Sequence, residues 1–251
     1  MESLAHYPFL VFVLTFVFLS IATIAGASLH KRYPTVTADH KDDLGIILAA
    51  TLTLLALIIG FSFAMATNRY DERKRLEEAE ASATRTEIAR AELLQPVEAE
   101  KVRKLLREYL DQRILFYDIR DISRRAQIAQ RTSQLEGDLW VPIREAAAAQ
   151  PTPVVALIVA GMNDVLKAQG DAQAAEWNRI PIAAWLLMAA IALCSTVLLG
   201  YRARTSMPLA LVLPLVVASS FFLIADIDAP RHGLIHVGPE NLKSVALGHT
   251  Q

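Results

Sequence analysis

The chain has 251 residues, of which 53% are hydrophobic and 20% charged, and its mean hydropathy is +0.33. Such a composition requires apolar and polar segments to be separated along the chain rather than mixed. The formal net charge is −1. The only strongly one-signed stretch, 101–131, holds nine bases against four acids but no nucleic-acid-binding motif, so nucleic acid is not an expected partner.

Four uncharged apolar runs occupy 8–29, 44–67, 182–200 and 207–225. At a helical rise of about 1.5 Å per residue, each run is long enough to cross most or all of a hydrocarbon core of roughly 30 Å. The pattern predicts an all-α membrane protein with four transmembrane helices in the lipid bilayer. A signal peptide is the alternative for the first run, but its leader lacks Lys and Arg and its apolar core is long.

Four spans place both termini and the long central segment on the same side of the membrane. Arg69, Arg73, Lys74 and Arg75 directly follow the second span, and the positive-inside rule then makes that side cytoplasmic. Bases in the two short loops favour the opposite orientation. We expect a multi-pass protein of the cell inner membrane whose N-terminus, central region and C-terminus are cytoplasmic.

The second span is expected to continue beyond the bilayer as one helix. The residues after Arg69 are mostly Glu, Lys, Arg, Ala and Leu, which are good helix formers, and no Pro interrupts them before Pro96. The helix should therefore run to about Gln95. Small residues at Ala79, Ser82 and Ala83 would allow another helix to approach, although Ala is also simply a good helix former.

The rest of the central segment is also expected to be helical. Apolar residues with helical spacing predict one buried stripe in the next helix, formed by Val102, Leu105, Leu106, Tyr109 and Leu110. A pair of helical pieces should follow in 138–170, of which the apolar part 154–162 is too short to span a bilayer. Pro181 should lie in the first turn of the third span, and Pro214 should kink the fourth.

These elements predict a single membrane domain with a helical insertion. Transmembrane helices 1 and 2 lie in 1–67, and the helical cytoplasmic region continuing from helix 2 lies in 68–180. Transmembrane helices 3 and 4 lie in 181–226, and a cytoplasmic C-terminal tail in 227–251.

The sequence contains no signature of nucleophilic catalysis, phosphate binding or dinucleotide binding, so no enzymatic activity is expected. Asp226, Asp228, His232 and His236 resemble a metal site, but Pro230 and Gly233 interrupt the helix that would align them. We expect the two aspartates to form ion pairs with a base such as Arg231. No metal or cofactor is therefore expected. The alternative is a structural cation site at these residues, for which calcium is left open.

Several stretches resemble the bestrophin-like membrane proteins, a bacterial and plant family of largely unknown function. They are "GFSFAMATNRYDERKRLEEAEASA", "RIPIAAWLL", "LLGYRAR" and "LIADIDAPRHGLIHVGPENL", in this order along the chain. The resemblance covers about 45–245. The family's tail pattern Asp-x-Asp-x-Pro-x-x-Gly is matched by Asp226, Asp228, Pro230 and Gly233.

The resemblance implies kinship to bestrophins, which are pentameric anion channels with four spans per subunit and a helical cytosolic region. Their second span lines a hydrophobic neck, and Phe61 and Phe63 are the counterparts of its residues here. The consecutive acids that bind calcium in bestrophins are missing. Asp226 and Asp228 are a sparse substitute, so calcium activation does not follow from the resemblance.

The sequence therefore favours a homo-oligomeric, bestrophin-like ion channel. Anion conduction and assembly as a pentameric ring are what the resemblance implies. The expected pore-lining residues on the second span are Phe61, Ser62, Phe63, Asn68, Arg69 and Arg73. The alternative is a membrane-anchored signalling or scaffold protein whose helical cytoplasmic domain binds a partner. A carrier is disfavoured because the spans contain no internal ionisable residue.

Overall fold

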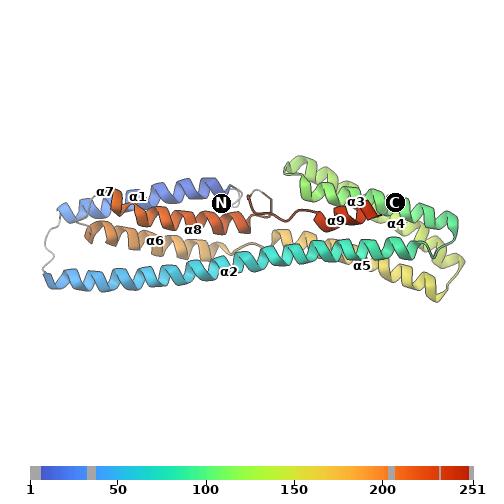
Figure 1. Cartoon of the computed structure of the whole chain (residues 1–251), viewed down its shortest axis with the longest axis horizontal. Coiled ribbons are helices and arrows are strands. Elements are labelled where there is room, and N and C mark those ends of the chain that lie inside the picture. The colour runs from blue at the N-terminus through green and yellow to red at the C-terminus, as the bar shows by residue number, and fades with distance from the viewer. Residues whose placement is uncertain (1–6, 33–37, 203–206, 232, 249–251) are drawn as a thin grey trace. The chain divides into compact units, whose positions relative to one another are not determined.

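The computed structural model of the protein describes residues 7–32, 38–202, 207–231 and 233–248, and within these ranges every regular element is a helix (Figure 1). In chain order they are α1 (Pro8–Arg32), α2 (Ala38–Ala91), α3 (Pro96–Asp118), α4 (Ile122–Ala149), α5 (Pro153–Trp177), α6 (Ile182–Arg202), α7 (Met207–Ala210), α8 (Val212–Asp228) and α9 (Glu240–Gly248). The expected all-α class is confirmed.

Four helical stretches are long and apolar enough to cross a membrane: Pro8–Arg32, Asp43–Ala91, Pro153–Arg202 and Pro208–Asp228. The expectation of four spans is confirmed. The second and third stretches also include long polar parts. In α2 the apolar part ends before Arg69, and in the third stretch it lies mainly in α6.

Helix α2 is 54 residues long and continuous, as the run of helix-forming residues predicted. It ends at Ala91, and Pro96 occupies a first-turn position of α3, where its missing N–H costs nothing. The chain divides into two compact units, Met1–Tyr70 with Arg179–His236 and Asp71–Asn178 with Val237–Gln251. Residues of α2 therefore contribute to both units.

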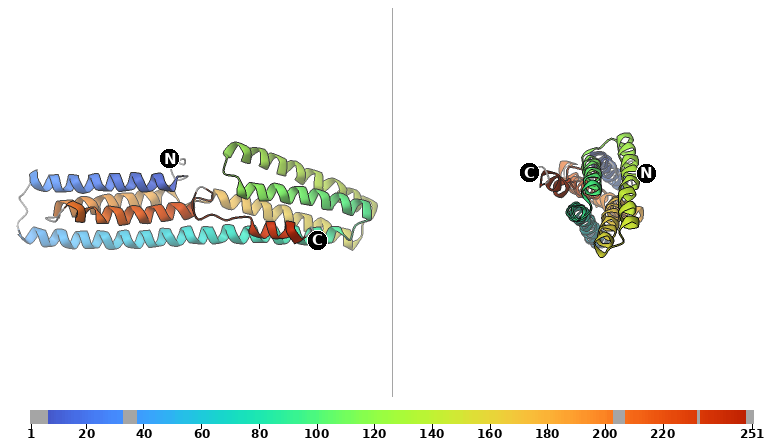
Figure 2. Two further views of the ribbon diagram at one scale, coloured as in Figure 1. Left: turned by 45° about the horizontal axis from the view of Figure 1, so that its top comes forward. Right: turned by 90° about the vertical axis from the view of Figure 1, so that its right-hand side faces the viewer.

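In the first unit, α1 packs along α6 and α8 (Figures 1 and 2). The core joins Leu19 of α1, Leu55 of α2, Met188 of α6 and Phe221 of α8. Two glycines allow α1 and α6 to approach at backbone distance. A Cβ on Gly26 would overlap the carbonyl oxygen of Val197, and a Cβ on Gly200 would overlap that of Thr23.

The fourth span has a one-residue irregularity at Leu211, three residues before Pro214, and its predicted kink stays a prediction. Pro214 has no N–H to donate to a carbonyl four residues earlier, and the helical run divides at Leu211 into the short α7 and the longer α8. Leu211 N–H donates to the Pro208 carbonyl, and Leu215 N–H donates to the Leu211 carbonyl to begin α8. Pro214 thus lies in the first turn of a new helix.

In the second unit, α3, α4, α5 and α9 share a core with one face of the charged part of α2. The predicted apolar stripe of α3 is confirmed, since Val102, Leu106, Tyr109 and Leu110 are buried and Leu105 packs against the same core. The apolar start of α5 is buried along one face, whereas Val154 and Leu157 are exposed. Its Val155, Ile158 and Met162 join this core, together with Leu242 and Val245 of α9. Pro142 is accommodated inside α4.

The glycine contact between α1 and α6 generates a stability prediction. Gly26→Ala should destabilise the protein by about 1–3 kcal/mol, because the added methyl group meets rigid backbone and the helices must separate. Reversible unfolding of detergent-solubilised protein measures the change. Gly137→Ala in α4 is the control, since a Cβ added there meets no described atom within 4 Å beyond the adjacent residues and backbone of its own helix, and the helix should be slightly stabilised. Equal effects of both variants would contradict this packing.

Candidate functional site

The apolar part of α2 buries only one narrow face inside the subunit. Leu48, Leu55 and Ser62, spaced seven residues apart, are at most 8% exposed. Spacing of seven residues is nearly two helical turns, so these side chains share one stripe. The other faces of this segment are open, and Phe61 is 66% exposed.

The expected pore residues lie on different faces of α2. Ser62 and Arg73 are buried inside the chain, whereas Phe61, Phe63 and Asn68 are exposed. Each residue advances an α-helix by about 100°, so Phe61 and Phe63 are separated by about 200° and cannot point to the same axis.

Arg69 lies seven residues after Ser62 and therefore continues the buried stripe of α2. It is half-buried, and its guanidinium lies 3.7 Å from the Met65 sulfur. The six expected positions therefore do not form a single surface. Phe61 and Asn68, seven residues apart, are the pair that shares an exposed stripe.

Asp226 fixes the turn that follows α8. Its two carboxylate oxygens accept hydrogen bonds from the Leu234 N–H at 2.7 Å and the Ile235 N–H at 2.9 Å. Gly233 permits this return of the chain, because a Cβ there would overlap the backbone oxygen of Asp226. The carboxylate thus accepts hydrogen bonds from two backbone N–H groups of the turn, which have no carbonyl partner within a helix.

Asp228 ties the end of α8 to the approach of α6. Both of its carboxylate oxygens lie within 3.3 Å of the Ile180 N–H, two residues before α6 begins. Arg231 is 5% exposed, and its expected ion pairing with the two aspartates stays a prediction. His232 lies outside the described residues.

The aspartates do not fit a calcium site. In the described part of the chain, no group of three or more His, Cys, Asp or Glu side chains could hold a metal ion. Calcium takes six to eight oxygen ligands, and the oxygens of Asp226 and Asp228 already accept backbone N–H groups. We therefore assign these carboxylates a structural role.

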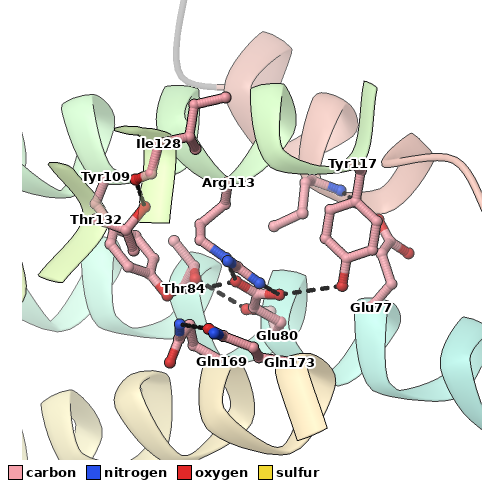
Figure 3. Close-up of polar contacts among 11 residues, drawn as sticks. Glu77, Glu80, Thr84, Tyr109, Arg113, Tyr117, Ile128, Thr132, Gln169 and Gln173 are labelled. Atoms are coloured by element: carbon pink, nitrogen blue, oxygen red, sulfur yellow. Dashed lines mark hydrogen bonds and ion pairs between the residues drawn. The ribbon is translucent and has the colours of Figure 1, made fainter. Parts of the chain in front are cut away.

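A second cluster of buried charge lies in the other unit, around Glu80 of α2 (Figure 3). Glu80 forms a two-contact ion pair with Arg113 of α3, in which the guanidinium Nε contacts Oε1 and Nη2 lies 3.1 Å from Oε2. The hydroxyls of Tyr109 and Tyr117 donate to the same carboxylate at 3.3 and 3.4 Å. Both charged side chains are at most 1% exposed.

This environment changes the protonation of the groups around Glu80. Burial raises the pKa of the Tyr109 and Tyr117 hydroxyls, and the negative charge of Glu80 raises them further. Burial alone would lower the pKa of Arg113, but the charge and hydrogen bonds of Glu80 raise it above its ordinary value. The two tyrosines therefore stay neutral donors and Arg113 stays charged across the physiological range.

Glu77, one turn before Glu80, holds the start of α9. Its carboxylate accepts the N–H groups of Asn241 and Leu242, both at 3.0 Å, and the Asn241 side-chain amide at 2.6 Å. A carboxylate at the N-terminus of a helix pairs with donors that lack helical partners and favourably meets the helix dipole. The charged part of α2 thus directs several of its acidic side chains toward the core of the second unit.

The sequence interpretation did not identify the buried polar face of α2. Its members recur every three or four residues and are all buried: Arg73, Glu77, Glu80, Thr84 and Glu87. This spacing is the one signal that could have revealed them, because it places them on one face of α2. Hydropathy alone describes such residues as solvent-exposed.

The sequence of this chain matches the model of the Bestrophin-like domain over residues 15–242. The chain belongs to the bestrophin-like family. No curated protein sequence matches it.

Solved structures with the same fold include a bacterial bestrophin homologue from Klebsiella pneumoniae. One structure of this homologue, phased on zinc, is 14% identical, covers 94% of this bestrophin-like chain and 97% of its own, and has a TM-score of 0.63. A single-residue variant of it is 13% identical, covers 94% and 96%, and has a TM-score of 0.65. At this identity the likeness establishes the fold, and it confirms the resemblance noted in the sequence.

The roles of Asp226 and Asp228 lead to a prediction about calcium. Adding calcium or a chelator should leave the thermal stability of the wild-type protein unchanged, because the carboxylates serve backbone donors. Asp226→Ala should lower stability by about 1–3 kcal/mol under both conditions, since it leaves two N–H groups unpaired. Thermal unfolding in detergent provides the measurement. A chelator-reversible stabilisation that is lost in Asp228→Ala would instead reveal a cation site.

The Glu80–Arg113 pair leads to a second prediction. Arg113→Met should destabilise the protein by about 3–5 kcal/mol, because it leaves a buried carboxylate without its counter-charge. Adding Glu80→Gln should recover part of this loss, since the amide is neutral and still accepts from the tyrosines. A double-mutant cycle of unfolding free energies measures the coupling. Arg75→Met, which breaks the exposed Glu72–Arg75 pair, is the control and should have little effect. Additive effects at Glu80 and Arg113 would contradict the pairing.

Proposed function

We propose that this bestrophin-like protein is a subunit of a homo-oligomeric ion channel of the cell inner membrane. In this proposal α2 lines the pore and several subunits surround a common axis, five of them by analogy with bestrophins. The observation that carries the proposal is the large exposure of Phe61 within an apolar segment that buries only one narrow face in its own subunit. A ring of identical subunits would cover the remaining faces of α2.

The stripe that contains Phe61 has the polarity expected of a pore wall. Leu54 and Leu57 precede Phe61 on the same side of α2, and Asn68 follows it seven residues later. Such a stripe presents apolar side chains inside the membrane and a polar one at its exit. A ring of Phe61 side chains would form a hydrophobic constriction able to close by expelling water.

Anion conduction is the selectivity that we propose. Arg69 follows the constriction at about 80° around α2 from Phe61, and the charge on its long side chain would make the potential at the pore exit more positive. Ser62 and Arg73 contribute to packing instead, because they are buried in the subunit. The basic residues after the apolar part of α2 also support the cytoplasmic location of both termini and the central region.

The pore proposal makes a prediction about Phe61. Phe61→Ala should raise leak flux several-fold in liposomes, because removing the ring widens the constriction and makes a continuous water column more favourable there. Flux is measured with several anions and cations and normalised to assembled oligomer.

Phe63→Ala is the matched control because it removes the same ring from the opposite side of α2. It should affect stability without raising leak. Unchanged flux in Phe61→Ala, or an equal increase in both variants, would exclude Phe61 as the constriction. A strictly monomeric protein in mild detergent would overturn the oligomeric channel itself.

A further inference from the structure

Glu87 differs from the other buried acids of α2 because its carboxylate lacks hydrogen-bond donors among the described residues. Its side chain is fully buried, and neither carboxylate oxygen has a hydrogen-bond partner in the described part of the chain. By contrast, Glu77 and Glu80 each accept at least three hydrogen bonds. A buried carboxylate without donors is costly when it is ionised.

The carboxyl lies where α2 meets α5. A Cβ on Gly161 of α5 would overlap Oε2 of Glu87 and Nη1 of Arg90, so the absence of a side chain at this position creates the space for both groups. Arg90 lies between two acids. Its Nη1 is 3.9 Å from Glu87 and 4.0 Å from Asp164 of α5.

We propose that Glu87, Arg90 and Asp164 form a proton-sensitive junction that holds α5 on α2 most firmly when Glu87 carries a proton. In the protonated state the carboxyl is neutral, and Arg90 is available to Asp164 across the helix contact. Release of the proton to solvent leaves a buried anion that draws Arg90 away from Asp164. The junction then contains a poorly solvated charge and loses its link to α5.

The electrostatics agree with this geometry. Burial raises the pKa of Glu87 to about 8 from an ordinary value of 4.5, while the Arg90 charge lowers it and the Asp164 charge raises it. These two residues are the charged groups that act on Glu87 from α2 and α5. Glu87 belongs to the charged part of α2, beyond its apolar span.

The sign of the pH dependence follows from the raised pKa of an acid. When the junction opens, Glu87 regains its ordinary pKa and releases its proton, whereas the closed junction keeps the proton until about pH 8. The closed state is therefore most favoured below about pH 4.5 and loses stability as the pH rises toward 8. Above that pH both states are ionised, and the loss levels off.

Hydrogen–deuterium exchange of the full-length protein in detergent tests the junction. Protection factors for the first three turns of α5, corrected for intrinsic exchange, should fall by at least about ten-fold between about pH 6 and about pH 8 and then level off. Glu87→Gln should remove this dependence, because the amide cannot ionise. Glu78→Gln is the matched control, since it makes the same change at an exposed position of α2 and should behave like the wild type.

Asp164→Asn keeps the test decisive if Glu87→Gln fails to fold. Asp164 has a side chain that is 68% exposed, so its replacement does not disturb the core. Because the Asp164 charge raises the pKa of Glu87, its removal should move the levelling-off to lower pH and reduce the total loss of protection. A wild-type α5 whose protection does not change with pH, or the same change in Glu87→Gln, would overturn the proposal. Neither result depends on channel activity.

Discussion

The second unit depends on how the buried acids of α2 are neutralised. A long helix that presents Glu77 and Glu80 on its packed face can fold only if the neighbouring helices supply donors to both carboxylates. Arg113 and two tyrosines compensate Glu80, and the N-terminus of α9 compensates Glu77. These contacts fix α3 and α9 beside α2 more specifically than apolar packing does, since each carboxylate accepts only donors in the correct geometry.

The first unit uses carboxylates in a related way at the end of α8. Asp226 and Asp228 accept backbone N–H groups from the following turn and from the approach to α6. These contacts with the backbone give the aspartates a structural role at both positions. The acids in both units therefore act mainly as acceptors that organise the chain.

Most of the fold could be predicted from the sequence, because long periodic signals determine it. Four apolar runs indicated the spans, and the lack of Pro between Arg69 and Pro96 predicted the continuity of α2. The inward face of α2 beyond Arg69 could not be predicted in the same way. Glu and Arg normally face solvent, and their burial depends on partners such as Arg113 that lie more than thirty residues away in the chain.

The candidate pore surface was only partly predictable for a related reason. The sequence located the apolar segment but not its rotation about the helix axis, and so residues from several faces were grouped together. Burial of Ser62 and Arg73 fixes that rotation, because both must face the interior of the subunit. Helical geometry then turns Phe61 and Asn68 outward and Phe63 to the opposite side of α2 from Phe61. Any helix that leaves the bilayer changes from apolar to polar side chains at its exit, so the narrow buried face of α2, and not this order of side chains, carries the proposal of a pore surface.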